Sequence, residues 1–190
     1  VVVGQGYHER AGEPHAEIHA LNMAGVRARG ATLYCTLEPC SHTGRTGPCA
    51  VRVVEAGIAN VVAAIEDPNP LVCGRGFSYL RDHGVTVHVG LAAPAATRLN
   101  WPYLTYMKER RPWVTLKAAF SVDGCIAEVP GRRSHLTSAA ANRHAHRYRA
   151  EVDAIAVGVG TVIADDPLLT ARGVYRERPL LRVVFDRQLR

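Results

Sequence analysis

The 190-residue sequence lacks any uninterrupted run of about 18 apolar residues, the length that a membrane-spanning helix requires. It has few aromatic residues (6%), no internal repeat and no low-complexity segment. The opening VVVG is too short to be a signal peptide. An apolar fraction of 47% and a charged fraction of 21% are ordinary for globular proteins. We therefore expect a soluble, cytoplasmic protein that binds no membrane.

The five cysteines are odd in number and have no regular spacing. This pattern argues against a framework of disulfides and favours a reducing compartment. Three of the five lie close together in the segment CTLEPCSHTGRTGPC, which runs from Cys35 to Cys49. Closely spaced cysteines in a reducing compartment are typical of a metal site.

The formal net charge is +6, and arginine and histidine gather between residues 132 and 149. A basic balance suits either nucleic acid or a phosphorylated small molecule. Sparse aromatic residues and the absence of a basic stripe beside the cysteines argue against nucleic acid. We expect no nucleic-acid partner and a phosphorylated small-molecule substrate.

Helix and strand signals alternate in the first part of the chain. The patterns predict a short helix at 15–25, a strand at 30–39, a helix at 49–58 and a buried strand at 60–68. The pattern of residues 76–90 again predicts a helix, a glycine turn and a strand. Such alternation predicts an α/β layered domain over residues 1–92.

A second α/β domain is expected over residues 112–190, after a connecting helix and linker at 93–111. Its predicted elements are a strand at 113–124, a helix at 138–149, a strand and turn at 153–162, and a strand at 180–186. The chain ends just after a strand, and it opens within the strand-like VVVGQGYH. We therefore expect it to be truncated at both ends.

One histidine and two cysteines are spaced as zinc ligands. His15, Cys40 and Cys49 are three soft donors, and a catalytic zinc site uses three protein ligands, whereas a structural site is closed by four. Glu17 lies two residues after His15. These two side chains can share a site only at the first turn of a helix, which Pro14 favours. Glu17 would then be the general base and acid beside the metal.

The order of these residues follows the signature of zinc nucleobase deaminases, H-x-E and then P-C with a later cysteine, and it predicts hydrolytic deamination. Here eight residues, instead of two, separate the cysteines. A closed structural zinc with Cys35 or His42 as a further ligand remains open, and it would suit a nucleic-acid-binding module. A single-function nucleobase or tRNA deaminase also remains open. His19 is expected either to have a structural role or to support the zinc ligands from behind.

The chain resembles the deaminase half of the bifunctional riboflavin-biosynthesis deaminase–reductases in three segments, GYHERAGEPHAEIHAL, TLYCTLEPCSHTGRTGPC and EDPNPLVCGRG. It resembles the reductase half in VTLKAAFSVDGCIA, RAEVDAIAVGVGT and ADDPLLTAR. The resemblance implies a cytidine-deaminase-like three-layer α/β/α domain, followed by a partial dihydrofolate-reductase-like α/β domain. It also implies zinc-dependent deamination of a diaminopyrimidinone that carries a ribosylamino 5-phosphate, then NADPH-dependent reduction of the ribosyl to a ribityl chain. Zinc and NADPH are the implied cofactors, and the implied assembly is a homo-oligomer.

Residue by residue, the resemblance implies zinc ligation by His15, Cys40 and Cys49 and proton transfer by Glu17. The implied deaminase substrate contacts are His8, His42, Arg45, Asp67 and Asn69. The implied reductase substrate contacts are Arg133, Arg149, Leu169 and Arg172, with Lys117 as a further candidate. The implied cofactor contacts are Ala119, His135, Thr161 and Asp165.

The chain departs from the family pattern at three of its positions. The family usually has serine and tryptophan where this chain has Arg133 and His135, and it has proline where this chain has Gly47. For Asp67 and Asn69, turn formation by the DPNP sequence is an alternative to substrate binding.

Overall fold

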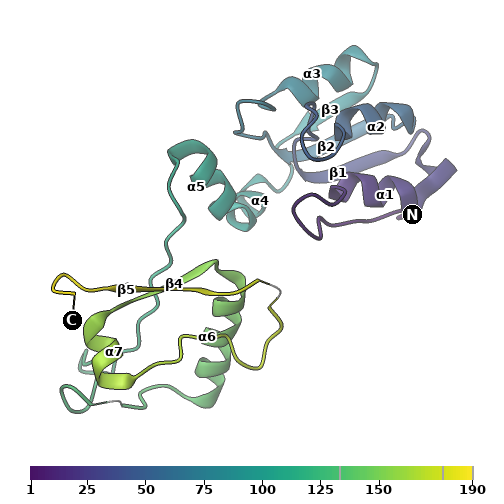
Figure 1. Cartoon of the computed structure of the whole chain (residues 1–190). Helices are drawn as coiled ribbons and strands as arrows, with labels where there is room; N and C mark the ends of the chain where they lie inside the picture. Colours follow the sequence, from purple (N-terminus) through teal and green to yellow (C-terminus); the bar gives the residue numbers. More distant parts are fainter. Residues whose placement is uncertain (133, 177, 190) are drawn as a thin grey trace. The chain divides into compact units, whose positions relative to one another are not determined.

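The computed structural model describes residues 1–132, 134–176 and 178–189. It divides into two compact units, Val1–Val114 and Thr115–Arg190 (Figure 1). None of the helices in the described ranges is both long enough and apolar enough to cross a membrane.

A parallel sheet of three strands forms the centre of unit 1. Its strands are β1 (Thr32–Leu37), β2 (Asn60–Ile65) and β3 (Thr86–Val89), hydrogen-bonded in that order. Parallel neighbours need a crossover connection, which is usually a helix. The alternation of helix and strand predicted for this part of the chain is confirmed.

Three helices pack on one face of this sheet (Figure 1): α1 (Ala16–Ala24), α2 (Cys49–Glu55) and α3 (Arg75–Asp82). Val53 of α2, Leu80 of α3 and Val61 of β2 are fully buried in the core between them. A short 3-10 helix (Gly25–Ala28) follows α1. This core holds the start of each helix at a defined place along the edge of the sheet.

Residues 93–111 are mainly helical and belong to unit 1. They form α4 (Ala93–Leu99), which contacts β1 and β2, and α5 (Trp101–Glu109). Tyr103 of α5 donates a hydrogen bond to Asp67, which follows β2. The functional domain limits at residues 92 and 112 stay a prediction.

Unit 2 contains a parallel pair of strands, β4 (Ala154–Gly158) and β5 (Leu181–Phe185), with Ala154 opposite Leu181. Helix α6 (Ala139–Glu151) precedes β4, and α7 (Val159–Asp165) follows it. Ser138 caps α6 by accepting a hydrogen bond from the backbone N–H of Ala141. Helix α6 and the two strands lie close to where the sequence predicts them, whereas α7 occupies the place of a predicted turn and loop.

Two predicted strands are absent from the described structure. Residues 113–121 are extended without strand pairing and lead into a turn at residues 122–123, and residues 1–9 also form no strand. Both segments have strand-like composition, but a strand requires a neighbour for its hydrogen bonds, and neither segment pairs with a described strand. The first segment of the chain packs instead on α1, since a Cβ at Gly6 would lie 2.4 Å from the carbonyl oxygen of Ala16.

The backbone passes unusually close to itself where α3 begins. A Cβ atom at Gly76 would lie 2.0 Å from the carbonyl oxygen of Pro39 and 3.0 Å from Oε1 of Glu38. Only glycine permits this approach, which brings the end of β1 against the start of α3.

Gly76→Ala is therefore expected to lower the free energy of unfolding by about 1–3 kcal/mol, because the added methyl group overpacks a rigid backbone contact. Thermal and urea denaturation followed by circular dichroism would measure the change. The control is Gly47→Ala, where a Cβ meets no atom within 4 Å. Equal stability of the two variants would contradict this interpretation.

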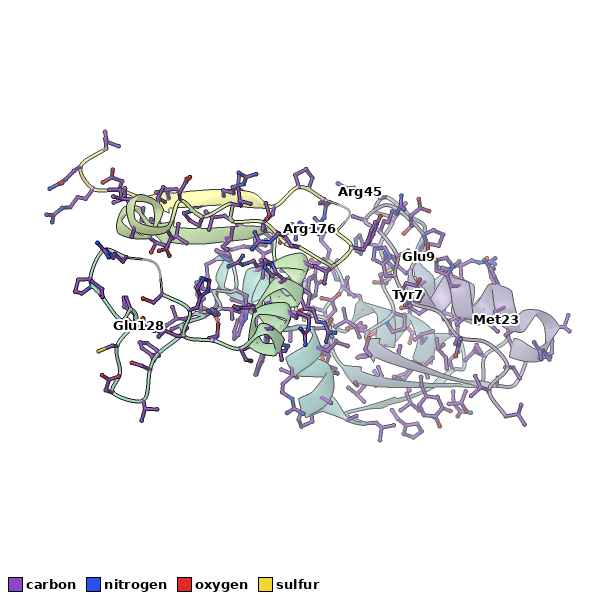
Figure 2. The ribbon with its side chains drawn as sticks, turned by 90° about the horizontal axis from the view of Figure 1, so that it is seen from below. Tyr7, Glu9, Met23, Arg45, Glu128 and Arg176 are labelled. Atoms are coloured by element: carbon purple, nitrogen blue, oxygen red, sulfur yellow. The ribbon has the colours of Figure 1, made fainter. Side chains whose placement is uncertain are left out.

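Arg176 closes the end of α6 in unit 2 (Figure 2). Its Nη1 donates hydrogen bonds to the carbonyl oxygens of Arg149 (3.0 Å), Ala150 (2.8 Å) and Val152 (2.6 Å). The last carbonyl groups of a helix have no partner within the helix, so a guanidinium group there replaces the missing donors.

Arg176→Ala should destabilise the protein by about 1–3 kcal/mol, because it leaves partly buried carbonyl groups without donors. Arg178→Ala is the matched control, because Arg178 pairs with Asp153 in an ion pair whose side chains are 79% and 83% exposed. Loss of such a surface pair costs about 0–1 kcal/mol. Urea denaturation of both variants would show whether the loss of Arg176 lowers the free energy of unfolding more than the loss of Arg178 does.

Candidate active site

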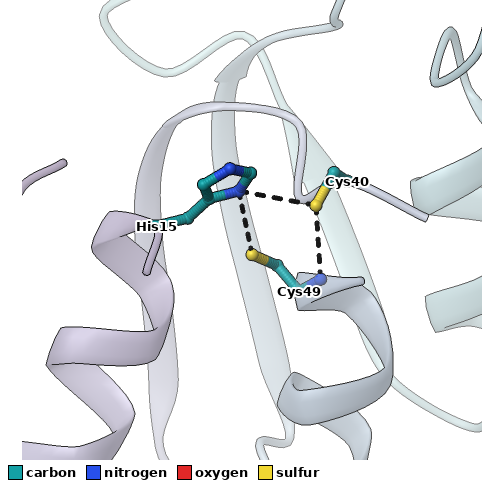
Figure 3. A group of neighbouring side chains, drawn as sticks. All are labelled: His15, Cys40 and Cys49. Carbon is teal, nitrogen blue, oxygen red and sulfur yellow. Dashed lines mark hydrogen bonds between the residues drawn. The ribbon is translucent and has the colours of Figure 1, made fainter. Parts of the chain in front are cut away.

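Three donor side chains converge at one edge of the unit 1 sheet (Figure 3). His15 is the residue before the first turn of α1, Cys40 follows β1, and Cys49 is the first residue of α2. Nδ1 of His15 lies 3.5 Å from Sγ of Cys40 and 3.3 Å from Sγ of Cys49. All three donor atoms lie within 4.8 Å of one another. This geometry and this donor set fit a zinc ion.

Local structure around α2 orients the two cysteines. The backbone N–H of Cys49 donates to Sγ of Cys40 (3.3 Å), and the N–H of Ala50 donates to the carbonyl oxygen of Cys40 (3.0 Å). Free N–H groups at the start of a helix favour negative charge, so they favour thiolates. The first turn of α2 therefore holds Cys40 as well as Cys49.

The thiols of Cys40 and Cys49 differ in pKa because a hydrogen bond joins them. A hydrogen bond from Cys49 lowers the pKa of Cys40 to about 5, although burial opposes the shift. The same hydrogen bond, followed by burial, raises the pKa of Cys49. Cys40 is thus the more readily ionised thiol of the pair, and zinc binding would require both thiols to lose their protons.

Glu17 lies in the first turn of α1, beside these donors. Burial raises its pKa, while hydrogen bonds to its own backbone N–H and to Cys49 act in the opposite direction. His15 and Glu17 share the site because both lie at the very start of the helix, as the sequence predicts. A carboxyl group with a raised pKa is suited to both accepting and returning a proton.

Neither of the considered further ligands joins the cluster. Within the described residues, the group of close donors contains His15, Cys40 and Cys49 alone. The thiol of Cys35 donates to the carbonyl oxygen of Val62 (3.9 Å), and burial raises its pKa to about 12. A neutral thiol turned toward the next strand is a poor zinc ligand, so the arrangement favours three protein ligands with a fourth position open.

A cavity of about 260 Å³ adjoins the donors, and His15 and Cys40 form part of its wall. Three of the predicted substrate residues, His8, His42 and Arg45, line the same cavity. The ring of His8 packs edge-on against that of His15, with centroids 5.2 Å apart. Nδ1 of His42 is buried and has no hydrogen-bond partner among the described residues. The cavity is thus lined by two imidazole groups and a guanidinium group that the sequence assigns to the substrate.

The other two predicted substrate residues do not line this cavity. Asp67 is 5% exposed, and its Oδ1 accepts hydrogen bonds from the N–H of Asn69 (2.9 Å) and the hydroxyl of Tyr103 (2.7 Å). Oδ1 of Asn69 accepts from the N–H of Leu71 (3.1 Å). These bonds are the turn contacts considered as the alternative role, and substrate binding by Asp67 and Asn69 stays a prediction.

His19 lies apart from the metal donors. It lines a second cavity with Gln5, Tyr7, Glu9 and Met23 (Figure 2), where its Nε2 is buried without a hydrogen-bond partner in the described residues. Among the described residues it does not belong to the group of close donors, and its role stays a prediction.

In unit 2, three predicted substrate residues meet at Thr170. Arg149 donates to the Thr170 carbonyl oxygen (3.2 Å), and Arg172 donates to the Thr170 hydroxyl (3.4 Å). Leu169 is buried and has a φ of 49°. Burial and the charge of Arg172 both lower the pKa of Arg149. Two neighbouring guanidinium groups are suited to an anion such as phosphate.

The predicted cofactor residues lie on separate segments. Thr161 and Asp165 belong to α7, Ala119 is half-buried in the extended segment, and His135 is exposed. Lys117, the further substrate candidate, is also exposed. A Cβ at Gly158 or Gly160 would meet no atom within 4 Å. The backbone at the start of α7 is therefore open to solvent at both glycines. Arg133 lies outside the described residues.

Sequence reasoning assigned no role to Tyr103 or Glu38. Tyr103 carries no local signal, because its partner Asp67 is 36 residues away. Glu38 lies two residues before Cys40, and only the cysteine carries a recognisable sequence signal. Its neighbours become apparent only in three dimensions.

Comparison with known protein families gives two matches. Residues 1–65 match the cytidine and deoxycytidylate deaminase zinc-binding region, and residues 112–190 match the RibD C-terminal domain. The second match argues against a single-function deaminase.

The chain is also similar to whole proteins. It is 48% identical over 188 residues to the riboflavin biosynthesis protein RibD of Aquifex aeolicus, with 99% of this chain and 53% of that protein covered. It is 46% identical to RibD of Escherichia coli, with 100% of this chain and 55% of that protein covered. The chain thus spans about half the length of these relatives.

Solved structures give the same result. The similarity to Acinetobacter baumannii RibD has a TM-score of 0.89 at 40% identity and covers 99% of this chain and 55% of that one. A diaminohydroxyphosphoribosylaminopyrimidine deaminase/5-amino-6-(5-phosphoribosylamino)uracil reductase from Thermotoga maritima has a TM-score of 0.90 at 39% identity and covers 98% of this chain and 53% of that one. Both predicted fold types, cytidine-deaminase-like and dihydrofolate-reductase-like, are confirmed. A zinc-binding deaminase region followed by a RibD C-terminal domain, with this similarity along the whole sequence, makes the chain a member of the RibD family.

Proposed function

We propose that unit 1 is a zinc-dependent deaminase of riboflavin biosynthesis. Its substrate is 2,5-diamino-6-(5-phosphoribosylamino)pyrimidin-4(3H)-one, and its product is 5-amino-6-(5-phosphoribosylamino)uracil. The observation that carries the proposal is the cluster of His15, Cys40 and Cys49, which leaves a fourth position open beside Glu17. The open position distinguishes a catalytic site from a structural one.

Glu17 moves the protons in this reaction. When bound, zinc supplies the Lewis acidity that makes water a nucleophile at neutral pH. Glu17 accepts a proton from the attacking water and delivers it to the pyrimidine ring. The second water proton leaves with the amine, so that a C–O bond replaces the C–N bond and ammonia is released. The raised pKa of Glu17 supports this exchange in both directions.

The cavity beside the zinc donors supports binding of the phosphorylated substrate. Arg45 and His42 lie in the loop between the cysteines, where a guanidinium and an imidazole are suited to phosphate oxygens. His8, which precedes His15 in the sequence, lines the same cavity. Asp67 and Asn69 are proposed to contact the pyrimidine edge after some rearrangement of their turn.

Unit 2 is proposed to take part in the NADPH-dependent reduction that follows. Arg149, Leu169 and Arg172 would contact the phosphorylated substrate around Thr170, with Arg133 and Lys117 as further contacts. NADPH would supply the hydride, and the protein would orient it through Ala119, His135, Thr161 and Asp165. A cytoplasmic location and a homo-oligomeric assembly are part of the same proposal.

Glu17→Gln is expected to reduce ammonia release from the diaminopyrimidinone by about 10²–10⁴-fold, because the substitution removes the proton carrier. Zinc should remain near one per chain, since Glu17 is not a ligand. Ammonia would be assayed with a coupled enzyme, and zinc by elemental analysis.

Glu13→Gln is the matched control for this variant, because Glu13 is exposed and lies two residues before His15. It should leave ammonia release unchanged. Undiminished turnover by Glu17→Gln would exclude Glu17 as the proton carrier. A folded, zinc-loaded wild-type chain without turnover would contradict the deaminase itself.

Substitution of the cysteines tests the ligand set directly. Cys49→Ser should lose bound zinc and deamination together, because it removes one of three donors. Cys35→Ser should keep both, because its thiol faces Val62. Zinc analysis after dialysis measures the difference. Loss of zinc from Cys35→Ser would instead support a closed structural site.

A further inference from the structure

Glu38 is a buried acid, 3% exposed, that lies outside the group of zinc donors. Its Oε2 accepts hydrogen bonds from the N–H groups of Asp67 (3.2 Å) and Gly74 (2.9 Å). Its Oε1 accepts from the N–H groups of Gly76 (2.8 Å) and Phe77 (3.2 Å). A carboxylate has about four acceptor positions, so four backbone donors fill its capacity.

These four bonds tie together segments that are distant in the sequence. Asp67 and Gly74 bracket the loop between β2 and α3, whereas Gly76 and Phe77 lie in the first turn of α3. A negative charge at the start of a helix is favourable, since the free N–H groups point toward it. The absence of a side chain at Gly76 lets the Pro39 carbonyl oxygen approach α3.

The residues after Glu38 carry a proposed zinc ligand. Pro39 is fully buried and leads directly to Cys40. Cys40 is held from the other side by the first turn of α2, through the N–H groups of Cys49 and Ala50. The turn that presents the Cys40 sulfur is therefore fixed at both ends, by Glu38 against α3 and by α2.

We propose that Glu38 is a positioning residue for the metal, which holds the backbone of the Cys40 turn so that its sulfur stays in place opposite His15 and Cys49. The proposal rests on the zinc site of the proposed function. The Glu38 carboxylate belongs neither to the group of zinc donors nor to the lining of the cavity. It therefore acts through the position of Cys40. A role confined to the stability of the core is the alternative that an experiment must separate.

Glu38→Gln tests the proposal with little change in volume. In either orientation, the side-chain amide directs its NH₂ group at two backbone N–H donors and so loses two of the four bonds. Zinc affinity of the folded chain, measured by competition with a chromophoric zinc chelator well below the melting temperature, should fall by about 10–100-fold, as is typical when a group that orients a ligand is removed.

Glu55→Gln is the matched control, because Glu55 forms an exposed ion pair with Arg52 and should leave zinc affinity unchanged. Glu38→Asp keeps both carboxylate oxygens on a shorter side chain and should give an intermediate affinity. If Glu38→Gln does not fold, Glu38→Asp decides the matter.

A folded Glu38 variant with lowered thermal stability but wild-type zinc affinity would overturn the positioning role. This affinity measurement does not depend on catalysis. A wild-type chain that binds zinc but releases no ammonia would contradict the proposed function and leave the affinity comparison intact.

Discussion

The meeting of His15, Cys40 and Cys49 at one point is the constraint on which the architecture of unit 1 depends. In a parallel sheet covered by helices, strands end at the edge where the following helices begin. This arrangement places Cys40, after β1, beside Cys49, at the start of α2. Helix α1 packs with its start at the same edge and adds His15. The core residues of the three helices therefore also hold the ligands in place.

Burial acts differently on groups that are chemically alike within this site. Hydrogen bonds from Cys49 lower the pKa of Cys40, whereas burial raises the pKa of Cys35, whose thiol donates to the neighbouring strand. Burial also raises the pKa of Glu17. Hydrogen-bond donors, more than depth alone, thus separate a ligand from a packed bystander.

Local signals in the sequence predicted most elements and the three donors that the fold brings within 4.8 Å of one another. Pro14 marks the start of α1, and the H-x-E and P-C segments indicate the donors before any fold is known. The predictions of strands at 113–124 and in VVVGQGYH were wrong, because composition does not reveal whether a neighbouring strand is available for pairing. Contacts such as those of Glu38 join residues 29–39 positions apart. No local pattern encodes them.

The central claim is that one imidazole and two thiolates bind zinc and leave a position open. X-ray absorption spectroscopy of the zinc-loaded chain tests it most directly, because sulfur and nitrogen or oxygen neighbours differ in distance from the metal. The account predicts two sulfur neighbours at about 2.3 Å and two nitrogen or oxygen neighbours at about 2.0–2.1 Å, one of them from water. Three sulfur neighbours would contradict it, because Cys35 would then close the site.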